Sequence, residues 1–116
     1  MVVDKYIKEV EKLKLIFSSI QRNRIIFDHH FYERAICRPS QTPKEEEIIE
    51  NIVNPVRLKA AERQSPDKWR CYFDYGRMKA HIYILMVRDT SIKVKTVWIL
   101  NRDWRREINA RSNNYV

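Results

Sequence analysis

The spacing of apolar residues changes near Asn54-Pro55, and this change constrains the fold more than any other feature of the 116-residue chain. Before that point apolar side chains recur every three or four positions, as on the buried face of a helix. After it, short apolar runs alternate with turn residues, as in β-strands. Helices followed by strands predict an α+β domain with N-terminal helices packed on one face of a sheet. The length supports one hydrophobic core, so we expect a single domain over residues 1–116.

Residues 1–23 predict an amphipathic helix. Asp4 is placed to be its N-cap, and charged residues follow on the face opposite the apolar stripe. That stripe consists of Ile7, Val10, Leu13, Phe17 and Ile20. We expect the stripe to pack in the core; a helix that binds a partner is the alternative.

Three further elements are predicted before the period changes. Residues 24–28 are rich in β-branched and aromatic side chains, and therefore predict a short strand. Residues 29–38 predict a helix with Asp28 as its N-cap. Two prolines at 39 and 43 then require a turn, because neither fits inside a helix.

A capping box predicts where the third helix begins. Thr42 takes the N-cap position, Pro43 the first helical position, and Glu45 stands three residues after Thr42. Ile48, Ile49, Ile52 and Val53 form the apolar face of this helix. Asn54-Pro55 ends it, because proline disfavours the helical conformation of the residue before it.

About four strands are predicted in the second half, at 56–61, 69–75, 81–88 and 92–100. Their connections are too short for a crossover helix, so we expect an antiparallel meander. Gly76, the only glycine, is expected in a hairpin turn. Residues 101–116 form an Arg-rich tail, in which Trp104 and Ile108 suggest a helix.

Several classes of function lack their sequence signals. A single glycine excludes the glycine-rich loops that bind nucleotide phosphates. Two cysteines, Cys37 and Cys71, form neither a disulfide framework nor a metal knuckle, and three histidines do not have metal-ligand spacing. We therefore expect no cofactor and no metal. Charged residues interrupt every apolar stretch of the N-terminus, and the longest apolar run is too short to span a bilayer, so a cytoplasmic protein without a membrane partner is expected.

The formal charge of +8 is concentrated in the second half of the chain. Residues 1–58 carry ten Lys and Arg against nine Asp and Glu, whereas residues 59–116 carry thirteen against six. Such a bias predicts a polyanionic partner, of which RNA is the leading candidate. An acidic protein partner is the alternative.

One short pattern adds chemistry to this charge. His30, Arg34 and Arg38 recur every four residues, so on a helix they form one stripe. Guanidinium groups bind phosphate oxygens in pairs, and an imidazole titrates near neutral pH. The stripe therefore suits a phosphodiester; for His30, a place in helix capping is the alternative.

A short strand, a His-x3-Arg-x3-Arg helix, a helix ending in Asn-Pro and an antiparallel meander together resemble a family of small uncharacterised domains. These domains belong to the RelE-like, barnase/EndoU/colicin-type ribonuclease fold group. The resemblance covers residues 24–100, including a last strand with an embedded Thr96. The loop at 39–43 is longer than the usual connection between the two helices.

The resemblance implies a toxin-like endoribonuclease that works without a metal, by attack of a 2′-hydroxyl on the adjacent phosphate. It implies His30 as acid or base, with Arg34, Arg38 and Lys95 contacting the phosphate in the transition state. Further RNA contacts are expected from Arg70, Tyr72, Tyr75, Lys93 and Thr96. Tyr72 and Tyr75 point to opposite faces of a strand, so at least one of them is expected in the core. For Lys93 and Lys95, the alternative is that both lie on a solvated edge of the sheet.

Two other functions stay open at this point. One is a regulator that binds nucleic acid without cleaving it. The other is a small structural or interaction protein, of viral or plasmid type, that binds an acidic partner. An acidic antitoxin-like protein is a candidate partner in the toxin-like case. No helix-turn-helix or zinc-finger pattern supports sequence-specific DNA binding.

Overall fold

The apolar runs of the second half form four strands of an antiparallel meander, as predicted. In the computed structural model, which describes residues 2–113, these strands end within about two residues of the expected bounds. They are β2 (Leu58–Arg63), β3 (Lys68–Asp74), β4 (Ala80–Val87) and β5 (Ile92–Leu100). Gly76 has a φ of 107° in the β3–β4 connection, a backbone conformation that favours glycine.

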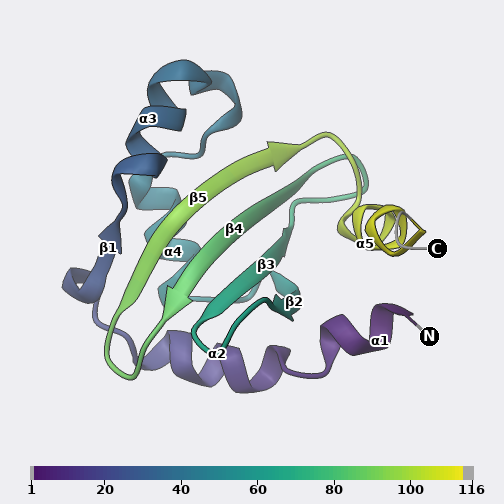
Figure 1. Ribbon diagram of the computed structural model, residues 1–116, viewed down its shortest axis with the longest axis horizontal. Coiled ribbons are helices and arrows are strands. Elements are labelled where there is room, and N and C mark those ends of the chain that lie inside the picture. Colours follow the sequence, from purple (N-terminus) through teal and green to yellow (C-terminus); the bar gives the residue numbers. More distant parts are fainter. Residues whose placement is uncertain (1, 114–116) are drawn as a thin grey trace.

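A fifth strand makes the sheet mixed. β1 (Ile25–Phe27) pairs in parallel with β5, and the strand order is β1-β5-β4-β3-β2 (Figure 1). The ladder runs on into a bond from the Asp28 amide to the Val94 carbonyl. The strand predicted at 24–28 is thus confirmed as β1, but the predicted sheet of about four antiparallel strands left it out, and the sheet has five strands. The connection from β1 to β5 includes helices and three strands, so it has the room that a parallel pair requires.

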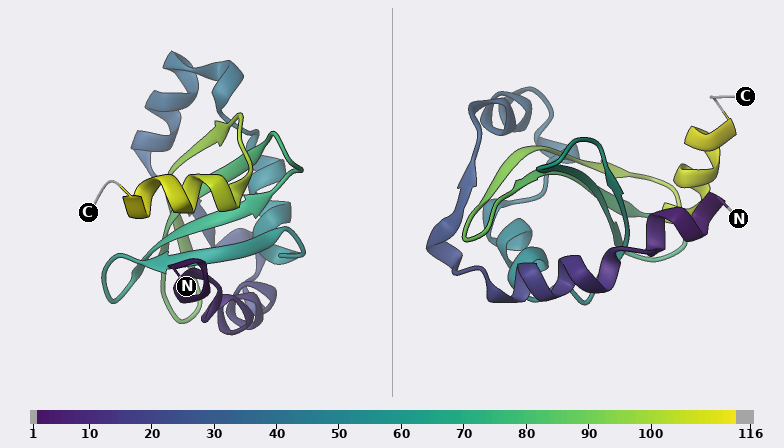
Figure 2. Two further views of the ribbon diagram at one scale, coloured as in Figure 1. Left: turned by 90° about the vertical axis from the view of Figure 1, so that its right-hand side faces the viewer. Right: turned by 60° about the horizontal axis from the view of Figure 1, so that its bottom comes forward.

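The N-terminal segment forms two helices, α1 (Val2–Ile7) and α2 (Val10–Ser19), where one was predicted. The break at Glu9 allows the chain to pass around the edge of the sheet at β2 (Figure 2). Tyr6 consequently packs on one face of the sheet, while Val10 packs on the other. Asp4 lies inside α1, so it is not the N-cap.

The second predicted helix is confirmed as α3 (His29–Cys37), and the Asp28 carboxylate accepts a bond from the His30 amide at 3.1 Å. The capping box was wrong. The Thr42 hydroxyl donates to the Arg38 carbonyl at 2.9 Å, and α4 (Glu45–Val53) begins after Lys44. Two short 3₁₀ helices, η1 (Arg22–Arg24) and η2 (Pro39–Gln41), flank β1 and α3. The Thr42 hydroxyl thus connects the end of η2 to the end of α3 and does not cap α4.

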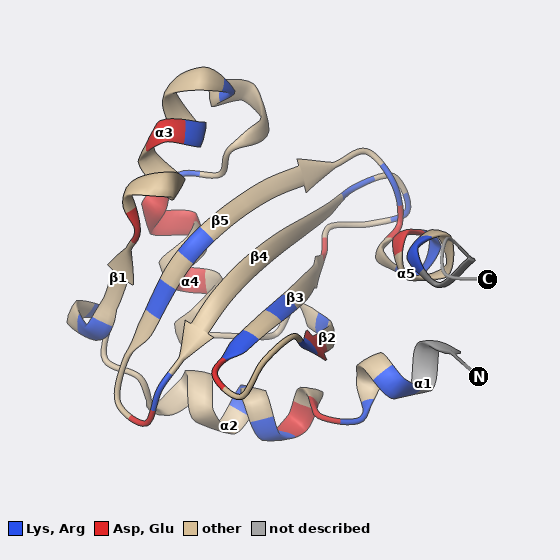
Figure 3. Ribbon diagram, in the orientation of Figure 1, with Lys and Arg blue, Asp and Glu red and all other residues tan. Residues whose placement is uncertain are grey.

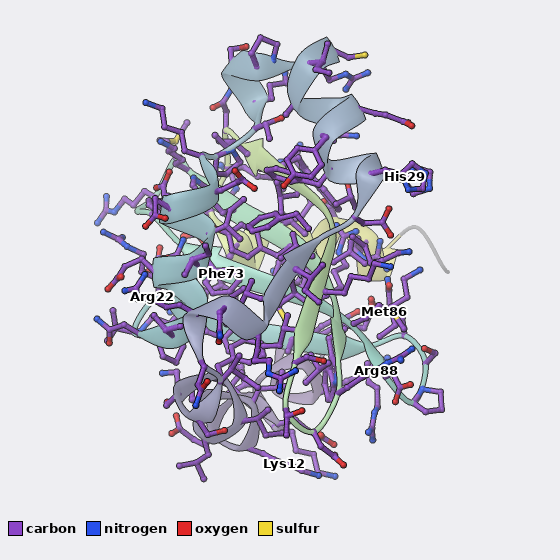
Figure 4. All side chains as sticks on the ribbon, turned by 90° about the vertical axis from the view of Figure 1, so that its left-hand side faces the viewer. Lys12, Arg22, His29, Phe73, Met86 and Arg88 are labelled. Carbon is purple, nitrogen blue, oxygen red and sulfur yellow. The ribbon has the colours of Figure 1, made fainter. Side chains whose placement is uncertain are left out.

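Helices cover the two faces of the sheet unequally. α2 and α4 pack on one face over the main core, and the view of Figure 4 places Phe73 on that side and Met86 on the other. On the other face, α5 (Trp104–Asn113) covers only one end, through Trp104 and Ile108. The predicted tail helix is thereby confirmed over the described residues. No helix of the described chain is both long enough and apolar enough to cross a membrane.

A bulge in β5 decides which side chains reach the face that α2 and α4 leave open. Ile84 pairs with Thr96, but the next residue, Leu85, pairs with Val94, so Lys95 is an extra residue. Val94 and Val97 both enter the main core. Lys95 and Thr96 are therefore both left for the open face.

Candidate nucleic-acid interface

A groove lies on the face of the sheet that α2 and α4 leave open, and it is lined by residues of α3, β3, β4 and β5. Figure 1 shows how these elements are arranged. The volume of the groove is about 660 Å³. One wall is the face of α3, and the floor is formed by the strands. The lining residues are His30, Glu33, Arg34, Cys37, Arg38, Gln64, Lys68, Arg70, Ile84, Lys95, Thr96 and Trp98.

The predicted stripe on α3 faces this groove. His30, Arg34 and Arg38 all line it, as their four-residue spacing predicts. Phe31 is buried on another side of the helix, where its ring lies 4.8 Å from that of Phe27. This apolar anchor fixes the rotation of α3, so the polar stripe is turned toward the sheet.

The strands add further positive charge opposite α3. Arg70 and Lys95, both predicted as contacts, line the groove, and Lys68 joins them from the start of β3. The lining holds five Lys or Arg side chains against one carboxylate, Glu33. Figure 3 shows Lys and Arg on α3, β3 and β5 around the open face, whereas α4 on the far side begins with acidic residues. The groove is thus a positively charged concave surface.

Asp28 connects the α3 wall of the groove to the strand β5 in its floor. Its Oδ2 accepts a bond from Lys95 Nζ at 2.7 Å, and its Oδ1 lies 2.9 Å from His29 Nδ1. Lys93 Nζ lies 3.7 Å from the same carboxylate. The Lys95 hydrogen bond, the His30 amide and the neighbouring positive charges hold the Asp28 pKa far below its usual range. One buried carboxylate therefore holds the first turn of α3 against the bulge in β5.

Trp98 lines the groove and lies close to two guanidinium groups. The Arg70 guanidinium carbon is 4.9 Å from the centre of the Trp98 ring, and that of Arg34 is 5.7 Å away. Arg70 Nε donates to the Tyr72 hydroxyl at 2.8 Å, and Arg70 lies 3.5 Å from Glu107 of α5. Arg34 Nε is buried, and no described residue accepts a bond from it. Both cations thus lie within 6 Å of the Trp98 ring centre, and Arg34 has a donor without an acceptor among the described residues.

His30 and Glu33 stand at the mouth of the groove. His30 Nδ1 lies 3.8 Å from Glu33 Oε2, and both side chains are more than half exposed. An imidazole beside a carboxylate can donate a proton to a bound ligand or accept one from it.

One group among the described residues has the composition of a metal site: Asp28, His29 and His30, whose ligand atoms lie within 4.8 Å of one another. Figure 4 shows His29 projecting into solvent at the start of α3. The ammonium of Lys95 already occupies the Asp28 carboxylate. The other oxygen, Oδ1, accepts the His30 amide and lies beside His29, so both oxygens of this carboxylate already have partners.

Three predicted contacts lie outside the groove. Tyr72 is fully buried under α5, where its edge meets the ring of Tyr6, and burial raises its pKa to about 12. Tyr75 lies on the opposite face of the sheet, stacked 3.8 Å from His81. Neither ring is available for stacking on a base in the groove, which corrects that expectation. Lys93 lies beside the groove through its contact with Asp28.

The sequence prediction missed Lys68, Glu33 and Trp98. Lys68 precedes Arg70 by two residues, and Trp98 follows Thr96 by two, so strand alternation places each beside a predicted residue. Glu33 shares a helical face with His30, three residues away. The signal was therefore present in the spacing.

Comparisons of this chain with protein-family models, with curated proteins and with solved structures found no match. The resemblance to the RelE-like ribonuclease fold group stays a prediction.

Proposed function

We propose that this protein binds RNA through the groove between α3 and the open face of the sheet. The observation that carries the proposal is the convergence of six predicted residues on one concave surface: His30, Arg34, Arg38, Arg70, Lys95 and Thr96. They come from three separate elements, so their meeting is a property of the fold.

The electrostatics of the groove favour a phosphodiester backbone. Its five cationic side chains would replace the counterions that a nucleic acid carries, and release of those counterions drives association. Two of these cations are already paired, Lys95 with Asp28 and Arg70 with Glu107. Arg34, Arg38 and Lys68 are therefore expected to contribute most.

Binding of a short single-stranded RNA, followed over a range of salt concentrations, tests the proposal. For single strands each neutralised phosphate contributes about 0.7 to the slope of log K against log salt, so three to five contacts predict a slope between about −2 and −3.5. Lys68→Glu should weaken binding about tenfold and flatten the slope by roughly one contact.

Lys12→Glu is the matched control, because it makes the same charge change on α2, on the covered side of the sheet. Equal losses in the two variants would indicate attraction to net charge alone and would contradict a groove. Tight binding of an acidic protein without RNA binding would favour the alternative partner.

RNA cleavage without a metal is a second candidate, favoured by the position of His30 beside Glu33 and Arg34 in the same lining. In such a reaction the 2′-oxygen forms a bond to phosphorus as the bond to the 5′-oxygen breaks. One group accepts the proton of the 2′-hydroxyl, and another protonates the leaving oxygen. His30 is placed for one of these transfers, and Arg34 for the charge on the phosphate.

Cleavage is tested in EDTA with the intact chain and with His30→Ala. Loss of cleavage with RNA binding retained would support His30 as a catalytic residue. Cleavage that persists in the variant would remove that role. Salt-sensitive binding without any cleavage would identify a protein that binds RNA and does not cut it.

A further inference from the structure

We infer that the groove binds the phosphate backbone through its cationic side chains, Arg34 among them, and does not read the bases. This inference rests on the proposed function and specifies its substrate class: a single strand of any base sequence. Three features of the described residues support it.

The first feature is the use of the aromatic ring. Trp98 is the one large aromatic side chain among the described residues of the lining. Two guanidinium groups lie within 6 Å of its ring centre. A base that stacked on Trp98 would have to compete with these cations for the ring, whereas phosphate would bind to them.

The second feature is the location of the other candidate rings. Proteins that stack bases on a sheet expose aromatic side chains on its bare face. Here Tyr72 is covered by the helix α5, and Tyr75 packs with His81 on the face that α4 covers. Ile84 and Thr96 supply the remaining floor near Trp98, and neither offers a ring.

The third feature is the arrangement of the donors. Arg34 lines the groove beside Trp98, and its Nε has no acceptor among the described residues, so the hydrogen-bonding capacity of this guanidinium group is only partly used. Arg70 approaches the same ring from β3 and is held in place by the Tyr72 hydroxyl. Guanidinium groups suit phosphate oxygens, because each group presents several donors and each oxygen accepts more than one bond.

The test compares two DNA oligomers of six units, oligo(dT) and an abasic oligomer with the same backbone. DNA has no 2′-hydroxyl, so cleavage cannot disturb the measurement. We expect their dissociation constants to agree within about threefold, because one stacked base is worth about 5- to 150-fold in affinity. We also expect Arg34→Gln to weaken both oligomers to the same degree.

Trp98→Leu separates the two roles of the ring. Loss of a support for Arg34 and Arg70 should weaken both oligomers equally, whereas loss of a stacking surface should weaken oligo(dT) alone. Oligo(dT) binding more than about fivefold tighter than the abasic oligomer would overturn base-independent recognition and leave RNA binding by the groove intact. Absence of binding to both oligomers and to RNA would remove the proposed function, and this inference with it.

Discussion

The Lys95 ammonium lies 2.7 Å from the Asp28 carboxylate and so connects the last strand of the sheet to the first turn of α3. The same carboxylate accepts the His30 amide and contacts His29. Asp28 thus performs two tasks, as the N-cap of α3 and as the counterion of a lysine in the groove. The orientation of the polar stripe relative to the sheet depends on both.

Asp28→Asn and Asp28→Ala separate these tasks. Asparagine retains N-cap capacity but loses the charge, whereas alanine loses both, so the free energy of unfolding should fall from wild type to Asn to Ala. The low pKa of Asp28 stabilises the fold above pH 3.8, and that contribution is lost as the pH falls below it. Urea denaturation at several pH values should therefore show the wild type approaching the Asn variant in acid. A constant difference across pH would contradict the ion pair.

The sequence was sufficient for those parts of the fold that local spacing determines. Residues 81–88 and 92–100 were predictable as neighbouring strands because a short turn joins them. The parallel pairing of Ile25 with Ile92 was not, because nothing local specifies a partner so distant in the chain. The break at Glu9 was also missed, since the apolar stripe of residues 7–20 continues through it. Only the edge of the sheet requires the chain to turn there.

The same distinction applies to the groove. The stripe of His30 and Arg34 followed from helical spacing, which is local. Tyr72 was misplaced because strand alternation gives its face but not the helix that covers that face. The bulge that brings Lys95 and Thr96 to one face arises from pairing with β4, and single-residue spacing does not reveal it.

Glu107 is expected to limit the affinity of the groove. Its carboxylate lies 3.5 Å from Arg70 and also contacts Arg102, so it offsets positive charge beside the site. Glu107→Gln retains hydrogen-bonding capacity while removing the negative charge. RNA affinity at low salt should therefore rise about threefold, and the salt dependence should become steeper. Glu11→Gln is the control, because it makes the same charge change on α2, on the covered side of the sheet. An equal increase would attribute the effect to net charge.

Asn51 supports a buried polar network on the covered face of the sheet. Its side-chain amide donates to the hydroxyls of Tyr75 and Tyr83, each at 2.7 Å. Asn51→Leu would leave the fully buried Tyr83 hydroxyl without this donor, so the free energy of unfolding should fall by about 2 kcal/mol. The double variant with Tyr83→Phe should lose less stability than the sum of the losses in the two single variants, because both substitutions remove the same hydrogen bond. Strict additivity in urea titrations would contradict the coupling.

His81 should make the stability of this protein depend on pH in the acid range. The His81 side chain is buried and contacts the Tyr83 hydroxyl. The positive charges of Arg57 and Lys79 oppose protonation of His81, whereas the negative charge of Glu47 favours it. Burial is the largest effect and lowers the His81 pKa to about 4, from 6.5 in the unfolded chain. The unfolded chain therefore takes up a proton at a higher pH than the folded protein does. The contribution of neutral His81 to the free energy of unfolding is fully present above about pH 6.5. It declines as the pH falls toward 4, by an amount on the order of 2 kcal/mol.

His81→Phe retains a ring against Tyr75 but cannot be protonated. Its free energy of unfolding relative to that of the wild type should therefore increase as the pH falls from 6.5 to 4. Urea denaturation of the two proteins between pH 7 and 4 measures the difference; parallel curves would show that His81 does not titrate there.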